Sequence, residues 1–395
     1  MKLWCPDGKR DKIVERFTVG NDYLLDQRLV PFDCRASAVH AEMLCAAGVL
    51  DASELADLQE ALQQIIELHA NGRFSISPEE EDCHTAIENF LTERCGEAGR
   101  KIHTARSRND QVLTALRLYE KSAMETIEDG LLNYRMSLKD LSDRQGDLPL
   151  PGYTHMQRAM PATLRMWAGS YDAASVDDAD LLQAVLRQVD QSPMGTAAGF
   201  GVPGFPMDRE RTAQQLGFAK VLQNPFYAQL SRGRTEAAVL ALCSQILLGL
   251  NRLATDLILF NTQEFGFVKL ADELTTGSSI MPHKKNPDVL ELLRGKYHVV
   301  VGEEMKVKGL TANLMSGYNR DVQLTKEPLF NGLDATIDCL TVMSRLLPGL
   351  TFDEDRCRKA MTEELYATER VYALVGQGMP FREAYRKVAE EWRVR

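Results

Sequence analysis

The chain has 395 residues, 44% of them hydrophobic and 26% charged, which is the composition of an ordinary globular protein with a large core. Its formal net charge of −10 argues against binding to the phosphate backbone of nucleic acids. The N-terminus is charged and the longest apolar run, residues 237–250, is too short to span a bilayer, so we expect a cytoplasmic protein without a membrane segment. The eight cysteines include no C-x-x-C pair and match no zinc template, so we expect neither disulfides nor a bound metal.

Helical spacing dominates the chain. Asp51 followed by Glu54 forms a capping box, which begins a predicted helix over residues 51–70. Apolar residues recur at steps of three and four from Met124 to Leu141, as in a long helix packed in a bundle. Alternating strand patterns are scarce, and the predicted fold class is all-α. Further long helices are predicted over residues 163–190, 235–262 and 288–310, and the second of these is apolar nearly all round and must be buried in a bundle or between subunits.

A glycine-rich stretch lies between two of these helices. Gly199, Gly201 and Gly204 match the G-x-G-x-x-G pattern of dinucleotide-binding proteins. No strand pattern precedes them, however, and no helix pattern begins before about Asp208. We therefore predict an irregular connector here and no nucleotide cofactor.

Three stretches concentrate basic and polar side chains on this acidic chain. Residues 100–111, 152–167 and 277–298 carry net charges of +3, +2 and +2. Positive islands on an acidic protein indicate a small anionic ligand. Chance clustering of charges on solvated faces is the alternative interpretation.

The first stretch, HTARSRNDQV at residues 103–112, precedes the long helix. Arginine offers a planar fork for carboxylates and asparagine can hold polar groups of either kind, so Arg108 and Asn109 are candidate ligand-binding residues. An exposed, capped helix start would explain Ser107 and Asp110, but it would not explain the whole polar run.

The second stretch, GYTHMQRAMPAT at residues 152–163, places Thr154, His155, Gln157 and Arg158 between a turn and the next helix. Histidine titrates near neutral pH and therefore suits proton transfer. A lone histidine can equally be a structural residue, so the motif leaves both interpretations open.

The third stretch reads GSSIMPHKKNP at residues 277–287. Gly277 gives the backbone freedom to open and close, and Pro287 suits the first position of the next helix. A serine hydroxyl can act as a base only if nearby cations and N–H groups stabilise its alkoxide, and Lys284 and Asn286 near the helix N-terminus supply such groups. A Ser-Gly linker with solvated lysines is the structural alternative.

These motifs resemble those of a known family. GSSIMPHKKNP is similar to the mobile loop of the fumarase/aspartase superfamily, and HTARSRNDQ with GYTHMQRAMPAT resembles its argininosuccinate lyase family. The segments EEEDCHTAIE (79–88) and SGYNRDVQLTKE (316–327) extend the resemblance, which covers nearly the whole chain. It implies a homotetramer around about twenty long helices, with active sites shared between subunits. It also implies an N-terminal helical domain (1–105), a central long-helix bundle with the catalytic loops (106–350) and a shortened C-terminal helical domain (351–395).

The resemblance further implies a reaction, the reversible splitting of argininosuccinate into arginine and fumarate in arginine biosynthesis, without metal or cofactor. Ser278 matches the general base, Lys284 and Asn286 match groups that stabilise the carbanion, and His155 with its partner Glu291 matches the acid side of the reaction. The substrate-binding positions of the family correspond to His84, Arg108, Asn109, Thr154, Gln157, Arg232, Ser279, Tyr318, Gln323 and Lys326.

Two segments depart from the family pattern. Residues 231–234 read SRGR where the family usually has Ser-Asp-Arg-Asp, and the family's substrate-contacting serine falls on Asp22. Two alternative functions remain: another fumarate-releasing lyase, of the adenylosuccinate lyase or aspartase type, and a non-catalytic structural relative like the lens crystallins of this family.

Overall fold

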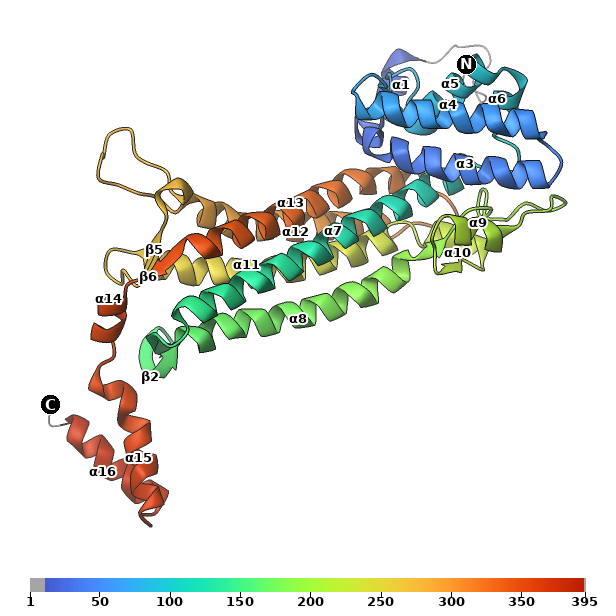
Figure 1. Cartoon of the computed structure of the whole chain (residues 1–395). Helices are drawn as coiled ribbons and strands as arrows, with labels where there is room; N and C mark the ends of the chain where they lie inside the picture. The colour runs from blue at the N-terminus through green and yellow to red at the C-terminus, as the bar shows by residue number, and fades with distance from the viewer. Residues whose placement is uncertain (1–10, 394–395) are drawn as a thin grey trace. The chain divides into compact units, whose positions relative to one another are not determined.

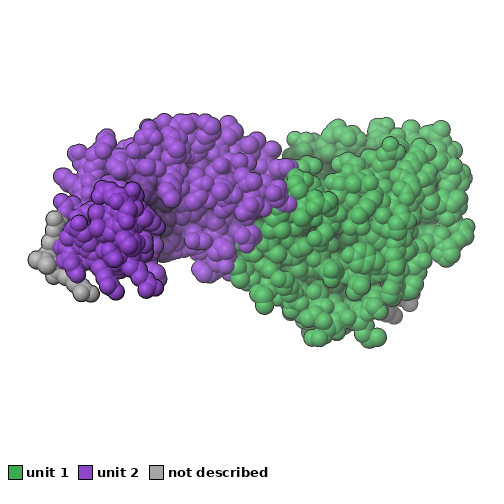
Figure 2. Space-filling model, turned by 90° about the horizontal axis from the view of Figure 1, so that it is seen from below, with its two compact units in different colours: residues 1–126, 181–244, 300–334 green, residues 127–180, 245–299, 335–395 purple. Residues whose placement is uncertain are grey.

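The computed structural model describes residues 11–393, which are mostly helical (Figure 1). The predicted all-α fold class is confirmed. The chain divides into two compact units, coloured green and purple in Figure 2. Unit 1 comprises the residues up to 126, residues 181–244 and residues 300–334. Unit 2 comprises residues 127–180, residues 245–299 and the residues from 335 onward.

Five long helices contribute residues to both units. The apolar seam predicted between Met124 and Leu141 lies in the first of them and is buried. The helices predicted over 163–190, 235–262 and 288–310 are also present within one residue at each end. The five are α7 (Arg108–Gln145), α8 (Leu164–Val189), α11 (Arg234–Asn261), α12 (Asp288–Thr311) and α13 (Lys326–Leu346).

Unit 1 adds further helices, of up to 19 residues, and one pair of very short parallel strands. The predicted capping box is confirmed, because Asp51 Oδ1 accepts hydrogen bonds from the N–H groups of Ser53 and Glu54, and the Glu54 carboxylate accepts one from the Asp51 N–H. The capped helix, α4, packs beside α3 (Figure 1). The added elements are α1 (Lys12–Val19), α2 (Asp22–Leu25), η1 (Asp26–Leu29), α3 (Val30–Ala46), α4 (Ala52–Ala70), α5 (Cys83–Cys95), α6 (Glu97–Lys101), β3 (Gln191–Ser192), α9 (Arg209–Gln215), β4 (Lys220–Val221), α10 (Pro225–Leu230) and η3 (Arg320–Thr325).

Unit 2 adds two antiparallel strand pairs and a C-terminal pair of helices. The helices α15 and α16 pack against each other through Val371, Ala384 and Val388, which are all buried. The added elements are β1 (Pro149–Thr154), β2 (Gln157–Thr163), β5 (Val268–Leu270), η2 (Asp272–Leu274), η4 (Leu347–Gly349), β6 (Leu350–Phe352), α14 (Glu354–Lys359), η5 (Glu363–Tyr366), α15 (Ala367–Gly376) and α16 (Phe381–Arg393).

The helix α11 extends beyond the apolar run at 237–250 at both ends, as predicted. By length and hydropathy it could cross a membrane, and it is the one helix of residues 11–393 that could. In the structure, however, 56% of its most apolar window is buried inside the protein. A core helix of a water-soluble protein has this character, because its apolar surface is covered by neighbouring helices.

The glycine-rich stretch forms an irregular connector, as predicted. Gly199, Gly201 and Gly204 all have φ between 74° and 100°, a left-handed conformation that glycine adopts without steric cost. The next helix, α9, begins only at Arg209. The strand–turn–helix context of a dinucleotide site is not formed by this segment.

The strands β1 and β2 form a hairpin that the sequence did not predict. Thr154 pairs with Gln157, so the turn consists of His155 and Met156 alone. Both residues have positive φ, 53° and 60°, which a two-residue turn of this hand requires and which asparagine and glycine normally supply. An L-residue with a larger side chain pays about 1–2 kcal/mol for this conformation, so the hairpin tip is strained. Strain of this kind is typical of functional sites.

We expect Met156→Gly to raise the free energy of unfolding by about 1 kcal/mol, because glycine relieves the strained φ. The Met156 side chain is 69% exposed, so little packing is lost. Urea unfolding measures the change. Met160→Gly is the matched control: Met160 is an exposed methionine of the same hairpin without a positive φ, and its replacement should destabilise. Equal destabilisation by both substitutions would contradict the assignment of strain to the turn.

Candidate active site

A polar pocket in unit 1 brings together six of the predicted substrate-binding residues. They come from three places: the first turn of α7, the turn before α11, and the segment from residue 318 to the start of α13. The pocket also contains Asp22, which the sequence analysis named as a departure from the family pattern, and four charged residues that it did not identify. Its lining consists of Asp22, Asp26, Glu81, Asp82, Arg108, Asn109, Val112, Arg232, Tyr318, Arg320, Gln323 and Lys326.

Lys326 is the buried cation of this pocket. Its side chain is 3% exposed, and its Nζ lies 2.6 Å from Asp26 Oδ1 and 2.8 Å from Asp22 Oδ1. Burial by itself would lower the pKa of Lys326, but the two carboxylates raise it above its usual value. Burial raises the pKa of Asp22 to about 6, although Lys326 opposes this rise. One ammonium therefore serves two carboxylates, and this end of the pocket can accept a positive group from a ligand.

Two other cations at the pocket, Arg108 and Arg320, are held by acidic residues near α5. Arg108 lies 3.1 Å from Asp82, which is also the N-cap of α5, and donates to Thr85 Oγ1 at 2.6 Å. Arg320 pairs with the buried Glu81 at 2.5 Å. The i, i+4 spacing of Asp22 and Asp26 and the run of acids at 79–82 were the sequence signals that could have revealed these partners.

The rest of the HTARSRNDQV motif shapes the start of α7. The Asp110 carboxylate accepts hydrogen bonds from the N–H groups of Ser107, Gly195 and Ala197 at 2.9–3.1 Å. These bonds complete a cap on α7 and anchor the glycine-rich connector. Asp110 is therefore structural, whereas Arg108 and Asn109 line the pocket.

Arg232 lies in the altered SRGR segment. It is buried and its Nη2 donates to Val322 O at 3.5 Å, but its Nε–H has no acceptor among residues 11–393. A bound anion could accept this hydrogen bond. The following residue, Gly233, has a φ of 76°, and a Cβ there would lie 2.2 Å from Thr311 Cγ2. The local backbone thus requires glycine at 233.

His84 lies behind the pocket and does not line it. It is fully buried, with Nδ1 3.1 Å from Asp33 Oδ2. Burial lowers the pKa of His84, but Asp33 and the nearby acids raise it above the usual value, so the ring favours the charged form. Its role in substrate binding remains a prediction.

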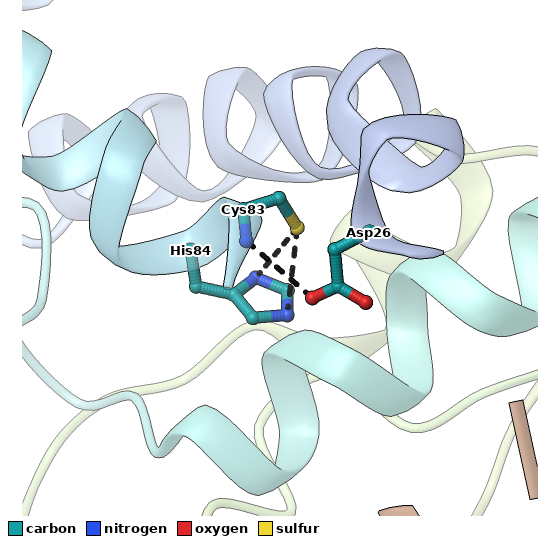
Figure 3. Close-up of side chains that lie close together, drawn as sticks. All are labelled: Asp26, Cys83 and His84. Carbon is teal, nitrogen blue, oxygen red and sulfur yellow. Dashed lines mark hydrogen bonds between the residues drawn. The ribbon is translucent and has the colours of Figure 1, made fainter. Parts of the chain in front are cut away.

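Asp26, Cys83 and His84 lie close enough to hold a metal ion (Figure 3). The donor set does not suit one, because metal ligation requires a thiolate and a neutral imidazole. Burial raises the pKa of the Cys83 thiol far above its usual value, and Asp26 is already paired with Lys326. No disulfide joins the seven cysteines of the described residues, whereas Cys5 lies outside those residues.

The serine loop belongs to unit 2. Two backbone hydrogen bonds between Thr276 and Asn286, at 2.8 and 3.1 Å, join the two ends of the loop. Within the loop, the Ser278 Oγ accepts hydrogen bonds from the N–H groups of Met281 at 3.1 Å and Ile280 at 3.4 Å. Two N–H donors directed at one hydroxyl oxygen would stabilise its alkoxide. Lys284 and Ser279 are exposed on the same loop.

His155 and Glu291 are both exposed residues of unit 2, at the hairpin tip and in the first turn of α12. Within residues 11–393, neither side chain has a hydrogen-bond or ion-pair partner. The predicted pairing of His155 with Glu291 is thus not formed in the isolated chain and remains a prediction for an assembly. Thr154 and Gln157 flank the two-residue turn and are exposed as well.

We expect Asp22→Asn to change how stability depends on pH. Between pH 3.8 and about 6 the native Asp22 keeps a proton that the unfolded chain has lost, so the free energy of unfolding falls as pH rises. The fall is at most about 3 kcal/mol and should be absent from the variant. Urea unfolding from pH 4 to pH 7 measures it, with Asp57→Asn, exposed on α4, as the control. Equal pH slopes in parent and Asp22→Asn would contradict the buried-carboxyl assignment.

The chain matches known proteins along nearly its whole length. Residues 6–302 match the family described as "Lyase". An argininosuccinate lyase of Thermotoga neapolitana is 48% identical over 99% of this chain and 98% of the relative, and one of Sorangium cellulosum is 44% identical over 99% and 90%. Among solved structures, a variant of EDDS lyase with bound fumarate has a TM-score of 0.81 at 24% identity, covering 98% of this chain and 76% of that one. This last likeness shows the fold alone. The chain therefore belongs to the lyase family, together with relatives that are argininosuccinate lyases.

Proposed function

We propose that the chain catalyses the reversible elimination that splits argininosuccinate into arginine and fumarate. The relatives that share 40–48% of its residues over nearly its whole length carry this activity in their names. The observation that carries the proposal is the unit 1 pocket, which combines four acidic and four basic side chains. Argininosuccinate bears carboxylates, an ammonium and a guanidinium, so a pocket of both signs suits it.

Ser278 is the general base in this proposal. Its alkoxide, stabilised by the N–H groups of Met281 and Ile280, takes a proton from the succinyl carbon. The C–H electrons pass into the neighbouring carboxylate, where Lys284 and Asn286 stabilise the negative charge. The C–N bond then breaks, a C=C bond forms in fumarate, and the leaving guanidino nitrogen gains a proton from the side of His155 and Glu291.

We propose that the enzyme is a cytoplasmic homotetramer with shared active sites. The pocket residues lie in unit 1, whereas Ser278, Lys284, His155 and Glu291 lie in exposed parts of unit 2. The helix α12 supports association: Leu292 and Val299 are 68% and 52% exposed and seven residues apart. A Cβ at Gly295 or Gly302, on the same stripe, would meet nothing within 4 Å. Apolar and glycine positions at heptad spacing allow another helix to approach closely.

Fumarate release tests the reaction directly. Purified protein should release fumarate, measured by its ultraviolet absorbance, from argininosuccinate but not from adenylosuccinate or aspartate. Release from one of the other two substrates would favour another lyase of the superfamily. No release from any of them would favour a non-catalytic, crystallin-like protein.

Ser278→Ala should lower kcat by at least about 10³-fold, because it removes the base and leaves the binding pocket intact. Ser279→Ala tests the neighbouring hydroxyl in the same loop and should retain measurable turnover. The mass of the assembly, from light scattering, should be unchanged in both. Turnover by Ser278→Ala at the parent rate would refute its role as base.

Val299→Asp should break the assembly, because it places an unpaired charge in a helix contact. Sedimentation velocity measures the fall in mass from that of a tetramer. Tyr385→Asp is the control, since Tyr385 is an exposed aromatic residue on α16, away from the stripe. An unchanged mass for Val299→Asp would contradict the proposed contact.

A further inference from the structure

Arg158 belongs to the motif that carries His155, but neither the resemblance nor the unit 1 pocket gives it a role. We propose that Arg158 is a positioning residue for His155, which it holds in place by fastening the β1–β2 hairpin to Thr362 and Glu364. This inference rests on the proposed function for His155. All the residues involved lie in unit 2.

Arg158 lies very close to the strained turn. The hairpin register pairs Thr154 with Gln157 and Tyr153 with Arg158, so Arg158 belongs to the second residue pair below the tip. A register shift between Gly152 and Tyr153 separates these two pairs from the regular ladder. Such an irregularity interrupts the backbone hydrogen bonding between the two strands next to the turn. Other contacts must therefore fix the position of the turn.

On the β2 side the fastening is polar. Arg158 Nη1 donates to Thr362 Oγ1 at 3.2 Å and lies 3.7 Å from Glu364 Oε1. The Thr362 hydroxyl in turn donates to the same carboxylate. This hydroxyl, and to a smaller extent Arg158, lowers the pKa of Glu364, so the acceptor is ionised at neutral pH. Thr362 and Glu364 lie at the start of η5, which fixes their backbone.

Strand β1 is held separately, by aromatic contacts of Tyr153. The ring of Tyr153 meets that of Phe265 edge to face at 5.9 Å, and Phe265 meets the buried Phe267 at 5.4 Å. Arg356 supports this segment by donating to Gln263 O at 2.9 Å. Both members of the Tyr153–Arg158 pair are thus held in place. The two residues line one pocket together with Gln157, Phe265 and Glu364.

The expected sizes of the effects on stability and on reaction rate distinguish a positioning role from a purely stabilising one. Arg158 and Glu364 are 41% and 45% exposed, and ion pairs between side chains as exposed as these contribute little to stability. A displacement of about 1 Å in a catalytic group can instead lower the rate by about 10²-fold. Loss of the fastening should therefore affect kcat far more than folding.

The test measures kcat and KM for argininosuccinate in single and double variants. Arg158→Gln and Glu364→Gln should each lower kcat about tenfold or more, with KM within about twofold and an unchanged urea midpoint. The double variant should be no slower than the worse single variant, because both remove the same fastening. Arg158→Lys should recover part of the rate. Arg165→Gln, at an exposed arginine at the start of α8, is the matched control and should be unchanged.

Three results would overturn the inference. An unchanged kcat in Arg158→Gln would show that the fastening is not needed. A rise in KM alone would make Arg158 a substrate contact. A loss confined to Arg158→Gln, with Glu364→Gln like the parent, would show that the effect does not pass through Glu364.

Hydrogen exchange separates this inference from the proposed function. If the parent releases no fumarate, the function fails, but the amides of residues 153–158 should still exchange about tenfold faster in Arg158→Gln than in the parent. Amides of α7 serve as the internal reference. Equal exchange at the hairpin would overturn the fastening whatever the activity.

Discussion

The unit 1 pocket depends on one buried ammonium group. Lys326 is almost completely excluded from solvent and faces Asp22 and Asp26, which lie about 300 residues earlier in the sequence. A buried charge is tolerated only when it is paired, so this contact fastens the segment 22–29 to the start of α13. The pairing also decides the chemistry of the pocket. The single positive charge of Lys326 is already shared by two carboxylates, so it does not attract an anion strongly. The remaining negative charge of the two carboxylates favours a cationic group of a ligand.

The requirement that charges at the pocket be paired also applies to two of its arginines. Arg108 and Arg320 are held by Asp82 and Glu81, which lie at the start of α5. Arg232 differs, because part of its guanidinium has no acceptor among residues 11–393. The pocket is therefore nearly neutral, with two carboxylates sharing one ammonium at Asp22 and an N–H group without an acceptor among residues 11–393 at Arg232. A ligand that carries both signs of charge satisfies both.

The proposed catalytic groups of unit 2 are held differently from the proposed binding groups of unit 1. Arg108 and Lys326 start long helices, whose packing fixes them. Ser278 and His155 lie on an exposed loop and on a two-residue turn. Groups on such segments can move during a reaction cycle, but they need local restraints. The N–H groups directed at Ser278 and the contacts of Tyr153 and Arg158 supply those restraints.

The sequence by itself determined the fold class, the bounds of three of the five long helices and the motifs that the proposed chemistry uses. These follow from short-range rules, because apolar spacing and capping residues act over a few positions. It did not predict the β1–β2 hairpin, since positive φ at His155 and Met156 contradicts their local preference. It also missed Asp22, Asp26, Glu81 and Asp82 as partners of the pocket cations. Only the tertiary structure decided these features, because ion pairs between residues far apart in the chain exist only after the helices have packed.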